Sequence, residues 1–111
     1  MATDTPKKLA QVQLTGSDAA IFTGVAAHTY TISSIVVCNT DTVLRTFRLH
    51  AVTAAGSSSA SNATFYDSPI EGNSTLPEFG RGWVLEGAAM LRGLADVAAK
   101  VTVTVFGIDT G

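Results

Sequence analysis

The chain has 111 residues, a length that suits one domain built around one hydrophobic core. Hydrophobic residues make up 46% of the sequence and charged residues only 14%, so the composition argues against intrinsic disorder. Seven basic residues against nine acidic residues give a formal net charge of -2, which argues against a protein that binds the phosphates of nucleic acids.

The start of the chain predicts an arm followed by two strands. Residues 1–8 include Pro6 and show no hydrophobic periodicity, so we expect a flexible arm that is disordered or ordered only by a partner. Apolar residues alternate over residues 8–15, which predicts a strand, and residues 19–23 predict a second, shorter one. No apolar run approaches the roughly 18 residues of a membrane span, and no export signal is visible, so we expect a soluble protein.

Residues 29–39 are the best candidate for a central strand. Their alternation turns into a continuous apolar run over residues 35–38, as expected where both faces of a strand are covered. Asn39 and Asp41 then favour a turn, because their side chains bond to nearby backbone and tolerate left-handed geometry. We therefore expect a tight hairpin that leads into Leu44.

Residues 45–52 predict the next strand, and a long loop follows it. The loop over residues 56–63 is small, polar and exposed, and one helical turn could start at Ser61. Residues 65–67 predict a short strand. In the strand at 45–52, the predicted core-facing residues are Phe47, Leu49 and Ala51, and the polar face consists of Thr46, Arg48 and His50.

The last third of the chain predicts short strands at residues 83–86 and 90–92 and a longer one at 101–108, where valines alternate with threonines. Turn signals recur roughly every 8 to 12 residues along the chain, which is typical of a sandwich or barrel. We therefore predict an all-β fold, a single-domain antiparallel β-sandwich of jelly-roll-like or Ig-like type over residues 9–111, with the arm at 1–8.

The sequence contains no pattern that indicates catalysis, a cofactor or a metal ion. It lacks a Gly-x-Ser-x-Gly elbow and any His-x-His or His-Glu-x-x-His spacing. His28 and His50 are therefore interpreted as surface or rim residues. Cys38, the single cysteine, excludes an internal disulfide and is interpreted as a small buried hydrophobe. We expect no catalytic residues, no cofactor and no metal, and hence no enzyme.

The order of these segments resembles a pattern found in small virion proteins of tailed bacteriophages. Residues 30–41 (YTISSIVVCNTD) end in an Asn-Thr-type turn, and the strand at 45–52 (RTFRLHAV) follows. A loop of small residues at 56–63 and an aromatic patch at 65–67 (FYD) come next. The resemblance continues in residues 83–87 (WVLEG), 90–92 (MLR) and 101–109 (VTVTVFGID).

The similarity extends from about Leu14 to Asp109, although Ala88 and Ala89 stand where the pattern usually has an acidic residue. It implies a non-enzymatic β-sandwich subunit of a virion, assembled in the host cytoplasm. The expected protein is a capsid decoration or cement protein, which binds the major capsid protein or other virion proteins and stabilises the shell. Analogy favours a homo-oligomer, a trimer, with no nucleic acid or membrane as partner. A neck, collar or tail subunit is the alternative.

An alternative of another class is a carbohydrate-binding or adhesin-like module. It would need Trp83, Tyr66 and Tyr30 to form an exposed stacking platform. In a virion protein, partner contacts are expected in the arm, in the loop of small residues and near the glycine turn at 80–82. The candidate interface residues are Thr3, Asp4, Thr5, Pro6, Lys7, Lys8, Ser57, Ser58, Arg81 and Trp83.

Overall fold

The computed structural model describes residues 4–79 and 82–111 of the chain. These residues form nine strands and one 3-10 turn, η1 (Ala60–Asn62). The strands are β1 (Asp4–Gln13), β2 (Ala19–Thr23), β3 (Thr29–Asn39), β4 (Arg45–Val52), β5 (Ala63–Ile70), β6 (Ser74–Phe79), β7 (Val84–Glu86), β8 (Met90–Ala95) and β9 (Val101–Thr110).

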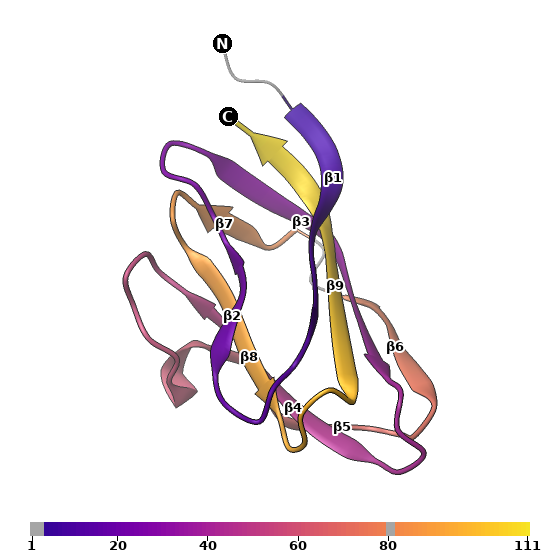
Figure 1. Ribbon diagram of the computed structural model, residues 1–111. Helices are drawn as coiled ribbons and strands as arrows, with labels where there is room; N and C mark the ends of the chain where they lie inside the picture. Colours follow the sequence, from indigo (N-terminus) through magenta and orange to yellow (C-terminus); the bar gives the residue numbers. More distant parts are fainter. Residues whose placement is uncertain (1–3, 80–81) are drawn as a thin grey trace.

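The strands form two antiparallel sheets that pack face to face (Figure 1). The first sheet has the order β1-β9-β3-β6, with β7 paired to the start of β3, and the second has the order β2-β8-β4-β5. The pairs β4 with β5, β3 with β6, β2 with β8 and β1 with β9 are nested, and successive pairs alternate between the sheets. This is the rolled-up hairpin of a jelly roll. The predicted single-domain antiparallel β-sandwich is therefore confirmed.

The core lies between the sheets and follows the alternation visible in the sequence. Val101, Val103 and Val105 of β9 are fully buried, as their spacing predicts. β3 is a central strand, with β9 on one side and β6 and β7 on the other. Phe47 and Leu49 of β4 close the core from the second sheet. Removing these apolar side chains from water is the main favourable term in folding.

The first strand begins earlier than the sequence predicts. β1 starts at Asp4 and pairs with β9, with Asp4 opposite Thr110 and Gln13 opposite Thr102. Residues 4–8, expected in a flexible arm, therefore form an exposed edge strand beside the end of β9 (Figure 1). The backbone of β9 provides hydrogen bonds that order this segment, and such pairing leaves no trace in side-chain periodicity.

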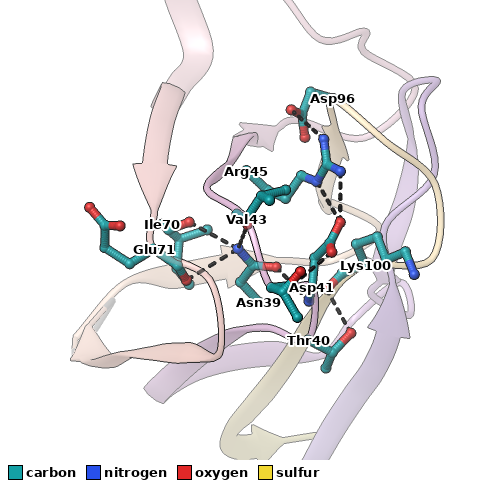
Figure 2. A network of polar contacts seen from close by, with 10 residues as sticks. Asn39, Thr40, Asp41, Val43, Arg45, Ile70, Glu71, Asp96 and Lys100 are labelled. Carbon is teal, nitrogen blue, oxygen red and sulfur yellow. Dashed lines mark hydrogen bonds and ion pairs between the residues drawn. The ribbon is translucent and has the colours of Figure 1, made fainter.

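The turn after β3 does not form the expected hairpin. β3 belongs to the first sheet and β4 to the second, so residues 40–44 carry the chain across the sandwich. The buried side-chain amide of Asn39 holds this crossing by donating hydrogen bonds to the carbonyl oxygens of Val43 and Ile70 (2.9 and 3.0 Å; Figure 2). Turn-forming residues mark a change of direction, but the partners of the strands decide which sheet the chain enters next.

Candidate functional site

The outer face of the second sheet carries a pocket with a volume of about 280 Å³, called here the polar pocket. Its lining residues come from β4, β5 and β8, from the turn before β2 and from the loop that leads into η1. They are Asp18, Arg48, His50, Ser58, Ser59, Ala60, Tyr66 and Leu94.

A β-bulge in β5 brings two side chains to Arg48. The residues on either side of Arg48 pair with Ser68 and Phe65, so Tyr66 and Asp67 both stand opposite Arg48. Arg48 Nε and Nη2 donate hydrogen bonds to the Asp67 carboxylate at 2.7 and 3.0 Å, and the guanidinium carbon lies 3.9 Å from the centre of the Tyr66 ring. The hydrogen bonds from Arg48 hold the pKa of Asp67 below its ordinary value. The bulge thus builds one wall of the polar pocket.

The prediction that His50 is a surface or rim residue is wrong. It lies on the outer face of β4, as the alternation predicts, yet only 4% of its surface is exposed. The loop between β4 and β5 folds over it, and His50 Nδ1 lies 2.9 Å from Asn62 Oδ1. The alternation along a strand shows which face of the sheet a side chain lies on. Whether that side chain is buried depends on whether a loop covers that face.

Asp18 closes the polar pocket on the side of β2 and β8. Arg92 Nε donates a hydrogen bond to Asp18 Oδ2 at 2.8 Å, and Ser58 Oγ donates one to Asp18 Oδ1 at 2.9 Å. Asp18 therefore connects β8 to the loop over His50. The two arginines near the pocket are each paired with a carboxylate.

A second hollow, called here the apolar groove, has a volume of about 290 Å³ and opens between the sheets at the end of β4. Ala51 faces inward from β4, as predicted, and pairs with Leu91 of β8. It is nevertheless exposed, so the described residues leave this flank of the sandwich open. The groove is lined by Ile32, Ile35, Ala51, Thr64, Trp83, Val84, Leu85 and Leu91.

The described candidate interface residues fall into three separate regions. Residues 4–8 lie on the β1 edge of the first sheet, and Trp83 precedes β7 at the other edge, with β9 and β3 between them. Ser57 is exposed and Ser58 half-buried in the loop over the second sheet. Thr3 and Arg81 lie outside the described residues.

The three aromatic residues of the carbohydrate-binding alternative do not form one platform. Tyr30 is 2% exposed in the core, and its hydroxyl accepts a hydrogen bond from the backbone N–H of Val25. Tyr66 lies on the outer face of the second sheet, and Trp83 lines the apolar groove. That form of the alternative is not supported.

His28 is half-buried at the rim, as predicted, and belongs to a small charged cluster. Its Nδ1 lies 2.7 Å from Asp109 Oδ1, and Lys7 Nζ lies 3.0 Å from Asp109 Oδ2. The hydrogen bond with His28, followed by the one with Lys7, lowers the pKa of Asp109. The cluster ties the start of β1 to the end of β9.

Sequence reasoning missed the polar pocket. Its only visible signal is Pro69, which marks β5 as an edge strand, where bulges are common. The pairing irregularity that sets Tyr66 and Asp67 against Arg48 has no signature in the residue pattern. Cys38, interpreted as buried, is half-buried because it faces the outer side of the first sheet.

Within residues 4–79 and 82–111, no helix has the length and apolar character to cross a membrane. Across the same residues, no three His, Cys, Asp or Glu side chains are grouped closely enough to hold a metal ion. Comparisons with family models, with curated proteins and with solved structures find no match to this chain.

Proposed function

We propose that this chain is a non-enzymatic structural subunit of a virion, a capsid decoration or cement protein that binds the major capsid protein of the assembled shell as a homo-oligomer. Each bound copy would bridge neighbouring shell subunits and stabilise the shell through its binding free energy. The jelly-roll order supports this proposal by fold-level analogy, because viral capsid domains commonly have this fold.

The apolar groove is the observation that carries the proposal. Ala51 and Val84 are exposed there, Val84 to 52%, and Trp83 is half-buried. Covering this apolar surface would lower the free energy of the subunit in water. A neighbouring protein that places apolar side chains in the groove would complete the core. This is expected for a subunit whose apolar surface is fully covered only in an assembly.

The sheet edges favour contacts through the groove and loops over strand addition. β1 contains Pro6 and shifts register after Lys8. β5 contains Pro69 and shifts register twice, and β2 has only five residues with one shift. Such features block continuous pairing with an added strand. Neighbours are therefore expected to dock without adding a strand at the β1, β2 or β5 edge.

Quantitative mass spectrometry of purified particles tests the proposal. A copy number equal to that of the major shell protein, or a simple fraction of it, would support a decoration protein. A few copies per particle would favour the neck, collar or tail alternative. Absence from particles would overturn the virion proposal.

A matched pair of variants tests the groove itself. We expect Val84→Asp to weaken shell binding at least about tenfold, because it places a charge against apolar surface that binding would dehydrate. Val43→Asp is the control, since Val43 is 51% exposed in the crossing between β3 and β4, at the other end of β4. Equal binding by the two variants would contradict a role for the groove.

A further inference from the structure

We propose that the polar pocket binds one ring of an uncharged sugar, at a site separate from the apolar groove. The proposal rests on a histidine ring nitrogen that is accessible only through the pocket, on the balanced charges around the pocket and on an exposed aromatic ring at its rim. It does not depend on the proposed virion function.

The hydrogen bonds of Asn62 determine the proton position on His50. Asn62 Oδ1 accepts a hydrogen bond from the Ser59 N–H at 3.0 Å, and its Nδ2 donates one to the Ser57 carbonyl oxygen at 2.9 Å. The amide orientation is therefore set, and His50 Nδ1 must donate to Asn62 Oδ1. In the neutral ring, Nε2 is then an acceptor.

This Nε2 atom makes no hydrogen bond to any residue in the described part of the chain. His50 is more than nine-tenths buried and lines the polar pocket, so the pocket is where a partner for Nε2 can come from. Among the described residues no fully buried side-chain nitrogen or oxygen lacks a hydrogen-bond partner, so Nε2 is reached by solvent through the pocket. A ligand group that donates a hydrogen bond to Nε2 can replace that solvent. A hydroxyl group fits this requirement.

The charges around the pocket favour a neutral ligand over an anion. Arg48 is paired with Asp67, and Arg92 beside the pocket is paired with Asp18. The pocket therefore has no excess positive charge to attract an anion, and the Asp18 carboxylate would repel one. Arg48 Nη1 has no hydrogen bond to another described residue and remains a donor, while Asp18 provides acceptors. Donors and acceptors set side by side match neighbouring hydroxyls, each of which can donate and accept.

The rest of the lining is apolar or aromatic. Tyr66 is 51% exposed, with the Arg48 guanidinium over its ring, and Leu94 and Ala60 contribute apolar surface. A sugar ring also combines polar and apolar surface, with hydroxyls on its rim and C–H groups on its faces. The volume of about 280 Å³ lies just below the usual range for ligand pockets, roughly 300 to 1,000 Å³, and suits a single ring.

NMR titration of the intact chain tests the site. Free galactose, glucose, mannose and N-acetylglucosamine would each be added to isotope-labelled protein. We expect at least one of them to shift the side-chain signals of His50, Asn62 and Arg48. Tyr66→Ala should weaken this binding about tenfold, and a thermal melt should show that the variant is folded, because the ring is largely exposed.

Phe106→Ala is the matched control, because Phe106 is an aromatic residue 39% exposed on the first sheet. It should bind the sugar as the unaltered chain does. Four results would each overturn the proposal: no shift with any of the four sugars, shifts confined to the apolar groove, equal weakening by Phe106→Ala, or the same pocket shifts with inorganic phosphate but not with sugars.

Discussion

The two ends of β4 differ in how they are closed. At its start, buried and charged groups join four segments of chain into what we call the polar corner: residues 39–46, 70–73, 96 and 100 (Figure 2). At its end, Ala51 lines the open apolar groove. One end is completed by the chain's own hydrogen bonds, and the other exposes apolar surface.

The polar corner shows what an internal crossing between sheets requires. Asn39 is fully buried, and its side chain donates to three carbonyl oxygens while accepting from the Asp41 N–H at 2.9 Å. Asp41 in turn accepts hydrogen bonds from Arg45 Nε and Nη2 at 2.9 and 2.7 Å. Backbone groups that leave a sheet need partners, and these side chains provide them. The apolar surface at the groove needs no hydrogen-bond partners, so it can remain exposed until a neighbouring protein covers it.

The largest effect is expected from Asn39→Ala, which should lower the free energy of unfolding by about 2 to 3 kcal/mol. The substitution removes the partner of the buried Ile70 carbonyl and of three part-buried backbone groups, the carbonyls of Val43 and Glu71 and the Asp41 N–H. Denaturant unfolding measures the loss. Asn39→Asp keeps the acceptor but removes the donors, so it should be destabilised to a similar degree; a stable Asn39→Asp would show that the donors do not hold the corner.

Two inward-facing alanines in the second sheet give a sharper test. Ala95 pairs with Phe47 near the polar corner and is 1% exposed, whereas Ala51 pairs with Leu91 at the groove and is exposed. Ala95→Leu should cost about 2 kcal/mol through overpacking. Ala51→Leu should change stability by less than about 1 kcal/mol, because its extra atoms enter open space. Equal losses in denaturant unfolding would mean that the groove is closed in solution.

The pH dependence of stability provides the smallest expected effect. The hydrogen bonds from Arg45, followed by that from the Thr42 N–H, lower the pKa of Asp41 from its ordinary value of 3.8. The folded state therefore binds the proton less readily than the unfolded state, so this contribution is full above the ordinary pKa and is lost as the pH falls through the folded pKa.

Asp41→Asn should make the denaturant midpoint fall less steeply with acid over this pH range. Asp67 and Asp109 also have lowered pKa values, so part of the slope should persist. Arg45→Gln should flatten the slope in the same way, since it removes the main cause of the shift. An unchanged slope in both variants would contradict a stabilising role for this ion pair.

Much of the fold could be predicted from local pattern. The apolar run of β3 predicted a central strand, and the alternating valines of β9 predicted a strand with one apolar face; both strands lie in the middle of the first sheet. The start of β1 could not be predicted, because its order comes from backbone pairing with a strand about 100 residues later in the chain. The polar pocket could not be predicted either, since a bulge and a returning loop assemble it.

By itself, the sequence determined the sandwich class, eight of the nine described strands and the inward and outward faces of the longer ones, because a period of two is a local property of each segment. It did not predict β6 (Ser74–Phe79), which pairs with β3 in the first sheet. Only the tertiary structure decided that Asn39 begins a crossing rather than a hairpin, that His50 is buried and that Ala51 is exposed. These outcomes depend on which distant segments lie above each residue. Alternation along a strand determines the direction of a side chain. The packing of distant segments determines whether that side chain contacts protein or solvent.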